Sequence, residues 1–259
     1  MTAHVRMGTR LLDRKAVVTG GASGIGFASA MRFAQEGAEV AIWDIDKSRI
    51  EECVESIRAT GAVAYGFQVD ISNTESVAAA AEATVATLGS VTVIMNNAGV
   101  LDDYATVLDT DDALWDRTFG VNIKGMFLVT RALLPAMLSA GGGAIVNTAS
   151  VAAFIAGGGG IAYTSSKHAV IGFTKQMSFD YAKQGVRVNA IAPGAVETGM
   201  TKDILNDEDL PVVAALRSAP AGRHAQPSEL ANVALFLASE EASFIHGAIY
   251  LVDGGWTIQ

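Results

Sequence analysis

Short apolar runs alternate along the chain with longer segments in which apolar residues recur every three or four positions. Apolar runs that end at Gly, Asn, Asp or Ser are typical of buried strands, whereas the longer period is typical of helices. The runs predict seven strands, at residues 15–20, 38–44, 62–70, 91–99, 144–150, 186–194 and 248–255. The periodic segments predict helices at residues 24–37, 47–61, 74–89, 111–141 and 163–185. We expect Gly37 to end the first helix and Thr74 to cap the third.

This alternation predicts the fold class. Apolar strands of this kind need helices on both faces of a parallel sheet, and right-handed crossovers then give an α/β, Rossmann-like doubly wound sheet of seven strands. No linker and no repeat interrupts the chain, so we expect a single domain over residues 1–259, with residues 1–12 as an N-terminal extension. Residues 197–225 break the strand–helix rhythm and are predicted to form a substrate lid.

Composition and charge narrow the class of protein. Half of the residues are hydrophobic and 17% are charged, which favours a compact domain with a large core. The formal net charge of −9 argues against nucleic acid and against an anionic membrane surface as partners. With no apolar run long enough to span a membrane and no signal-peptide core, a cytoplasmic location is expected. The single cysteine, Cys53, excludes an internal disulfide, and the histidines show no metal-ligand spacing, so no metal is expected.

A glycine-rich turn, TGGASGIG at residues 19–26, follows the first predicted strand and opens the first helix. Glycines at such a turn let the backbone approach a pyrophosphate at the helix N-terminus. The second strand ends at Asp44, whose carboxylate can accept hydrogen bonds from both hydroxyls of an adenosine ribose and would repel a 2′-phosphate. Asp44 can also be interpreted as a helix cap, a role for which Asp46 is at least as suitable. With the turn in its proper place, the sequence favours NAD over NADP as cofactor.

Tyr163 and Lys167 stand four residues apart in a predicted helix and therefore share a face. Hydride transfer from an alcohol to nicotinamide needs a base for the hydroxyl proton, but a free tyrosine titrates at about 10. A nearby ammonium lowers such a pKa by about 1–3 units, and a cationic nicotinamide ring adds to the effect. We therefore predict Tyr163 as general acid/base and Lys167 as the residue that lowers its pKa. His168 should point away, because one further position rotates the side chain by about 100°.

Two further polar residues are candidates for the site. Ser150 closes the fifth predicted strand, at the carboxyl edge where ligands bind in such sheets. Its hydroxyl can stabilise charge on a substrate oxygen, or it can simply cap a turn. Asn122 lies inside a predicted helix, where Asn is a mediocre helix former, so it is either an exposed polar residue or one with a specific role.

Five motifs occur in the order found in the short-chain dehydrogenase/reductases. They are TGGASGIG, NNAG at residues 96–99, Ser150, YTSSK at residues 163–167 and PGAVET at residues 193–198. The chain resembles a branch of that family with chains of this length, from about Lys15 to the DGG at residues 253–255. Each motif alone is weak, but five in order make coincidence very improbable. The resemblance implies an oxidoreductase with a nicotinamide cofactor.

The resemblance also implies roles for single residues. Lys167 would hold the nicotinamide ribose, and Asn122 would kink its helix and hold a water that links Lys167 to solvent. Asp70 would bond the adenine amine. Backbone groups of Val196 would contact the nicotinamide carboxamide, and the hydroxyl of Thr198 would contact the carboxamide or the pyrophosphate. The implied cofactor contacts are Gly20, Ser23, Gly24, Ile25, Gly26, Asp44, Asp70, Ile71 (through its backbone), Asn97 (under the adenosine ribose), Ala98, Gly99, Tyr163, Lys167, Pro193, Gly194, Val196 and Thr198.

The substrate pocket is predicted to lie between the segments after the fourth and fifth strands and the lid. No Arg or Lys occurs in the first two segments, and apolar residues are frequent there, which favours a neutral, partly hydrophobic secondary alcohol or ketone. The glycine run at residues 157–160 is expected to leave one pocket wall without side chains. The predicted substrate contacts are Ser150, Ala152, Phe154, Tyr163 and Met200, with Leu205 as lid packing.

Two alternatives to an NAD-dependent alcohol dehydrogenase or carbonyl reductase remain open. A 3-oxoacyl-thioester reductase of the acyl-carrier-protein type usually goes with NADPH and a basic residue in the glycine turn, where this chain has Ala22 and Ser23. A non-enzymatic NAD-binding scaffold would need no Ser150. The family resemblance further implies a homotetramer, for which the apolar segments HAVIGFTKQMSF and YLVDGGWTIQ offer surfaces.

Overall fold

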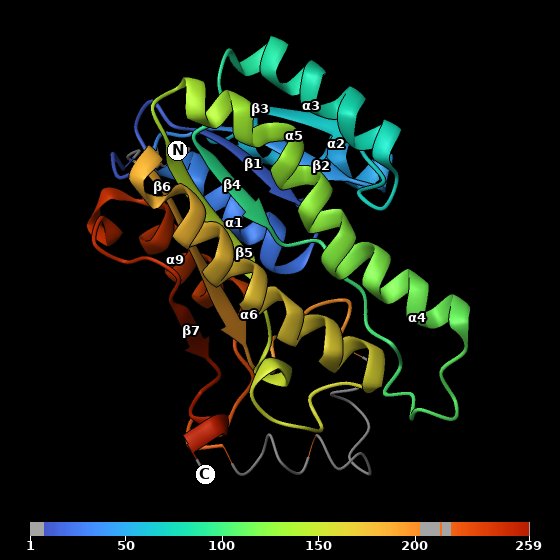
Figure 1. Ribbon diagram of the computed structural model, residues 1–259. Helices are drawn as coiled ribbons and strands as arrows, with labels where there is room; N and C mark the ends of the chain where they lie inside the picture. Colours follow the sequence, from blue (N-terminus) through green and yellow to red (C-terminus); the bar gives the residue numbers. More distant parts are fainter. Residues whose placement is uncertain (1–7, 203–212, 214–218, 259) are drawn as a thin grey trace.

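A sheet of seven parallel strands forms the centre of the molecule (Figure 1). The computed structural model describes residues 8–202, 213 and 219–258. The strands are β1 (Lys15–Thr19), β2 (Glu39–Asp44), β3 (Ala64–Gln68), β4 (Val93–Asn96), β5 (Gly143–Thr148), β6 (Val186–Pro193) and β7 (Ile249–Val252). Their order in the sheet is β3-β2-β1-β4-β5-β6-β7, and each neighbouring pair is parallel. The chain therefore changes direction across the sheet beside β1, which confirms the predicted doubly wound fold.

Helices cover both faces of this sheet (Figure 1). They are α1 (Gly24–Gln35), α2 (Lys47–Arg58), α3 (Thr74–Leu88), α4 (Asp112–Phe119), α5 (Met126–Ser139), α6 (Ile161–Tyr181) and α9 (Pro227–Ala238). The sequence pattern had not singled out α9, which begins with a proline at its first position. The cap of α3 is also corrected: Asn73, not Thr74, accepts the hydrogen bond from Ser76 N, because Thr74 is already helical.

Alternate residues of each central strand enter opposite layers of the core. In β1, Ala16 and Val18 pack in the cluster that includes α1, α2 and α9, whereas Val17 packs with residues of α3 and α5. All three side chains are completely buried. Because both faces of β1 are buried, its three central positions are all apolar and only its end residues, Lys15 and Thr19, are polar.

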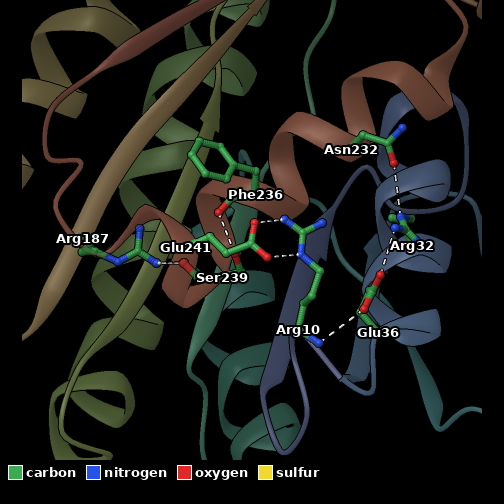
Figure 2. Close-up of polar contacts among 8 residues, drawn as sticks. All are labelled: Arg10, Arg32, Glu36, Arg187, Asn232, Phe236, Ser239 and Glu241. Carbon is green, nitrogen blue, oxygen red and sulfur yellow. Dashed lines mark hydrogen bonds and ion pairs between the residues drawn. The ribbon is translucent and has the colours of Figure 1, made fainter. Parts of the chain in front are cut away.

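The end of the predicted N-terminal extension belongs to the folded domain, although residues 1–7 lie outside the described part. Leu11 is completely buried among core residues. Figure 2 shows Arg10 forming two hydrogen bonds to the Glu241 carboxylate, while its backbone N–H donates to Glu36. Arg187 of β6 lies on the same side and donates to the carbonyls of Leu237 and Ser239, at the end of α9. These contacts stabilise the side of the sheet where the strands begin, opposite the carboxyl ends of the strands.

The helical segment Asp112–Ser139 runs through α4 and α5 as one long rod (Figure 1). The segment is long enough to cross a membrane, and an 18-residue window within it has a mean hydropathy of 1.3. Half of that window, however, is buried inside the protein. Such burial is typical of a helix that covers a sheet.

Candidate active site and cofactor site

A cavity of about 340 Å³ opens at the carboxyl ends of β1, β4, β5 and β6. Ligands bind at this edge in doubly wound sheets. The cavity is lined by Gly20, Ser23, Gly24, Ile25, Arg49, Asn97, Ala98, Gly99, Thr148, Ala149, Ser150, Tyr163, Lys167, Pro193, Gly194, Val196, Thr198, Gly199, Met200 and Thr201. Most of the predicted site residues therefore meet in one place.

The glycine turn is shaped for close backbone approach. Gly20 has a φ of +60°, and a Cβ built on it would lie 2.9 Å from the Cα of Ala98. A Cβ on Gly26 would lie only 2.0 Å from the carbonyl oxygen of Gly20. Gly26 does not line the cavity but lets the first turn of α1 fold back against the loop. The turn leaves the N-terminus of α1 open to the cavity at Ser23 and Gly24, which fits a cofactor pyrophosphate.

Asp44 braces this turn from the end of β2. Its Oδ2 accepts a hydrogen bond from Ala22 N at 3.0 Å and its Oδ1 one from Asp46 N at 3.2 Å. Asp46, not Asp44, caps α2, by accepting from Arg49 N. Asp44 is absent from the cavity lining, whereas Arg49 is part of it and forms an ion pair with Asp46 at 3.4 Å. Sequence reasoning missed Arg49 because it considered only the residues immediately after the strand.

The adenine end of the predicted site is less complete. Asp70 is exposed, and its Oδ1 accepts hydrogen bonds from the N–H and hydroxyl of Ser72. Ile71 is buried, and neither residue lines the cavity. Asn97 does line it, and its amide donates to the carbonyls of Thr19 and Gly20, at 3.2 and 3.3 Å. Asn97 thus links β4 to the glycine turn, while its predicted contact with the adenosine ribose stays a prediction.

Ser150, Tyr163 and Lys167 line the other end of the cavity. The Nζ of Lys167 donates to the carbonyl of Thr148 at 2.9 Å and lies 5.4 Å from the centre of the Tyr163 ring. The Ser150 Oγ accepts from Ala152 N at 3.1 Å, so the serine also caps the short turn after β5. His168 is exposed and contacts the Thr164 carbonyl, which confirms that it points away from the site.

The pKa of Tyr163 differs from the sequence-based expectation. It rises to about 12, first because burial disfavours the phenolate, while a hydrogen bond with Ser150 acts to lower it and the charges of Tyr104 and Asp102 raise it. Burial also lowers the pKa of Lys167 to about 8. In the protein alone, loss of solvation therefore outweighs any effect of the Lys167 ammonium on the phenol.

Asn122 is 1% exposed, so its interpretation as an exposed polar residue is wrong. It lies in a π-helical turn, Gly120–Gly125, between α4 and α5, which confirms an irregular backbone. Its amide nitrogen donates to the Val100 carbonyl and to Ser166 Oγ, both at 3.0 Å, and its oxygen accepts from Val100 N at 2.9 Å. A Cβ on Gly99 would lie 3.2 Å from Asn122 Oδ1 and 3.6 Å from Lys167 Nζ, so the two side chains converge there.

The substrate side of the site matches the prediction only in part. Met200 lines the cavity and is 49% exposed, whereas Ala152 is completely buried, and neither it nor Phe154 reaches the cavity. Sequence reasoning missed the backbone-rich lining by Thr148, Ala149, Gly199 and Thr201. The predicted lid is pinned at its ends by pairing of Val196 with Ala225. Within it, residues 203–212 and 214–218, including Leu205, lie outside the described part.

The glycines at residues 157–160 do not leave an open wall. A Cβ on Gly158 would meet the Cβ of Ala152 at 3.1 Å, and one on Gly159 would lie 2.4 Å from Cδ1 of Tyr163. A Cβ on Gly160 would lie 2.6 Å from the carboxylate of Asp102. Gly159 and Gly160 are therefore needed for close packing around the start of α6, and Gly158 lies against Ala152, which corrects the expected role.

Residues 20–257 match the family model described as "Enoyl-(Acyl carrier protein) reductase". The chain belongs to the short-chain dehydrogenase/reductase family. It is 41% identical over 254 residues to 2-(S)-hydroxypropyl-CoM dehydrogenase 3 of Xanthobacter autotrophicus, covering 97% of this chain and 99% of that one. It is 36% identical to cyclohexanol dehydrogenase of an Acinetobacter species, with 97% and 98% covered. A 3-oxoacyl-(acyl-carrier-protein) reductase of Thermotoga maritima is 37% identical, with 96% and 100% covered.

Solved structures agree with this assignment. Levodione reductase superposes with a TM-score of 0.90 at 32% identity, covering 95% of this chain and 98% of that one. A protein from Beutenbergia cavernae, assigned as an NAD(P)-dependent gluconate 5-dehydrogenase and crystallised with NADP at low occupancy, also gives 0.90, at 37% identity and with 96% and 98% covered. The chain is thus an oxidoreductase of the short-chain dehydrogenase/reductase family.

Proposed function

We propose that this oxidoreductase uses NAD to interconvert a neutral, partly hydrophobic secondary alcohol and its ketone, with Tyr163 as general acid/base. The observation that carries the proposal is the convergence of Ser150, Tyr163 and Lys167 in the same cavity as the glycine turn. Phenol, hydroxyl and ammonium are the groups that a proton transfer at a substrate oxygen requires.

The chemistry divides among three side chains. A bound nicotinamide cofactor supplies or receives the hydride. The Ser150 hydroxyl donates a hydrogen bond to the substrate oxygen, and Tyr163 takes the alcohol proton in oxidation or returns one in reduction. Lys167, whose Nζ donates to the Thr148 carbonyl, would bind the nicotinamide ribose, and its charge would favour the phenolate. Asn122 would position a water beside Lys167 at Gly99.

Charges at the adenosine end support NAD as cofactor. The Asp44 carboxylate lies at the end of β2 beside the glycine turn, where it would repel a 2′-phosphate. Arg49 is the opposing charge at the cavity, but it is paired with Asp46. Because the similar Beutenbergia cavernae structure holds NADP, comparison of kcat/KM for NAD and for NADP tests this preference.

The apolar side chain of Met200 at the cavity favours a neutral substrate. The names of relatives such as cyclohexanol dehydrogenase agree with a small alcohol. The thioester reductase of Thermotoga maritima keeps the second candidate open, but the glycine turn here carries no basic residue that would suit NADPH. A non-catalytic scaffold is disfavoured, because a protein that only binds nucleotide has no need of Ser150 beside Tyr163.

Exposed apolar side chains support the proposed homotetramer. Phe179 on α6 is 83% exposed and Phe244, after α9, is 98% exposed. Leu251 of the edge strand β7 and Ile258 are also exposed. Large apolar side chains that are exposed in one copy are often covered by contacts between copies in a symmetric oligomer. Sedimentation equilibrium of the full chain tests the tetramer, and a monomer at micromolar concentration would contradict it.

The activity is tested with a panel of cyclic and linear secondary alcohols and a 3-oxoacyl thioester, each with NAD or NADP, followed at the NADH absorbance. Turnover of neutral alcohols with NAD supports the proposal. Turnover confined to the thioester, or to substrates that bear a carboxylate or phosphate, would contradict it.

A further inference from the structure

The carboxylate of Asp102 is completely buried beside the catalytic tyrosine. Asp102 lies in the loop between β4 and α4, far in sequence from α6. Its Oδ1 accepts a hydrogen bond from Gly160 N and its Oδ2 one from Tyr163 N, each at 2.8 Å. Burial of a carboxylate costs free energy because the charge loses its hydration, and the two backbone donors offset part of that cost. A buried carboxylate at this position therefore indicates a specific role.

The start of α6 needs this carboxylate. The residue before the helix is Gly160, which has no side chain to cap the free N–H groups of the first turn. Asp102 supplies the cap from another part of the chain, and Tyr163 is one of the two residues that it binds. The backbone of the catalytic tyrosine is thus tied directly to the loop after β4.

The surrounding residues are shaped to this contact. A Cβ on Gly160 would lie 2.6 Å from Asp102 Oδ2 and from the Ala105 backbone. Ile161 N donates to the Ala105 carbonyl at 3.1 Å, and Ala105 N donates to the Asp102 carbonyl at 3.0 Å. Asp103 and Tyr104 have φ values of 52° and 57°. The loop therefore passes through two consecutive residues in the left-handed backbone region, which favours glycine. This strain is the kind that persists where other contacts determine the loop.

We infer that Asp102 is a positioning residue that holds Tyr163 at the start of α6, and that its carboxylate contributes to the pH range in which the tyrosine works. The inference rests on the proposed role of Tyr163 as general acid/base. It goes beyond that role because it assigns a function to a residue outside the cavity lining and outside the family motifs described above.

The groups around the phenol of Tyr163 act on its pKa in opposite directions. Ser150 and Lys167 face it from the turn after β5 and from α6, and Tyr104 and Asp102 from the loop after β4. The hydrogen bond from Ser150 lowers the pKa of Tyr163, whereas Asp102 and Tyr104 raise it. Removing the Asp102 charge should therefore make the phenol more acidic. Oxidation of an alcohol should then reach its plateau at a lower pH.

The experiment compares pH profiles of kcat/KM for oxidation of the best alcohol by NAD. Asp102→Asn keeps an oxygen acceptor and removes the charge, and Asp102→Ser, which can also cap a helix, is the second neutral variant. The matched control is Asp103→Asn, which removes the same charge one residue away, at an exposed position, and suits a left-handed backbone.

For the neutral variants at position 102 we expect the acid limb to move to lower pH by about 0.5–1 unit, with kcat reduced about tenfold at the plateau and the KM for NAD little changed. Asp103→Asn should match the unmodified enzyme. Profiles for Asp102→Asn and Asp102→Ser that coincide with that of Asp103→Asn would overturn the inference. If Tyr163→Phe were fully active, the proposed function itself would fail, which is a different result.

Discussion

The Nζ of Lys167 lies 5.4 Å from the centre of the Tyr163 ring, one helical turn along α6. The lysine side chain is buried and its single protein partner among the described hydrogen bonds is the Thr148 carbonyl. An ammonium held without a carboxylate destabilises the folded chain. The pair therefore combines an energetic cost with a place at the cavity, which is typical of functional sites.

The cost can be measured with Lys167→Met. The folded pKa of Lys167, about 8, is below its ordinary value of 10.5, so the cation is disfavoured in the folded state. Below pH 8 the variant should be more stable than the unmodified protein, on the order of 1–3 kcal/mol. The difference should shrink as the pH rises from about 8 to 10.5 and then vanish. Urea unfolding of the cofactor-free protein across this range checks the sign, and a destabilised variant at pH 7 would contradict it.

Gly26→Ala should abolish binding of NADH and lower the melting temperature. The new Cβ would lie 2.0 Å from the Gly20 carbonyl oxygen, and because that atom is backbone, the turn must shift. Gly172→Ala is the control, since nothing lies within 4 Å of its Cβ position. NADH fluorescence titration should show unchanged binding for Gly172→Ala, and retained affinity in Gly26→Ala would contradict the geometry of the turn.

A buried hydrogen bond away from the site predicts a stability effect without a catalytic one. Trp43 Nε1 donates to Thr84 Oγ1 at 2.9 Å, and both side chains are completely buried. Thr84→Val should destabilise the protein by about 1–3 kcal/mol, because the indole N–H is left unpaired. Thr87→Val on the same helix, at an exposed position, should change the free energy of unfolding by less than about 0.5 kcal/mol. Equal effects of the two variants would contradict this account of the core.

Variants of Asp44 and Arg49 test the proposed choice of NAD over NADP. We expect kcat/KM for NAD to exceed that for NADP by about tenfold or more, because the Asp44 carboxylate repels a 2′-phosphate. Asp44→Ala should narrow this ratio, whereas Arg49→Ala should leave the value for NAD nearly unchanged and lower that for NADP. A kcat/KM for NADP equal to or above that for NAD in the unmodified enzyme would overturn the interpretation of Asp44.

Local patterns predicted the strands, most helices and the residues that follow strand ends, because the glycine turn, Asn97 and Ser150 each adjoin an apolar run. Contacts between distant segments were beyond such reasoning. Asp102 has no signal in its own segment, since its partner is the start of a helix 58 residues later. The glycines before Tyr163 looked like open space in the sequence, but in the fold Gly159 and Gly160 meet Tyr163 and Asp102.

Burial explains why the pKa of Tyr163 and the exposure of Asn122 could not be predicted from the sequence. Sequence spacing placed Lys167 beside Tyr163 but gave no measure of desolvation, which in the folded protein raises the pKa of the phenol to about 12. The exposure of Asn122 was likewise undetermined, because the π-helical turn that buries it depends on packing against Ser166 and Val100.

The proposed mechanism requires Tyr163 to transfer the proton at the substrate oxygen. Its most direct test is steady-state turnover of Tyr163→Phe with NAD and the best alcohol, alongside NADH binding by fluorescence. We predict NADH affinity within a few-fold of the unmodified enzyme and a kcat reduced by about 10²–10⁴-fold, as expected for loss of a general acid/base. Near-normal turnover by Tyr163→Phe would contradict the account.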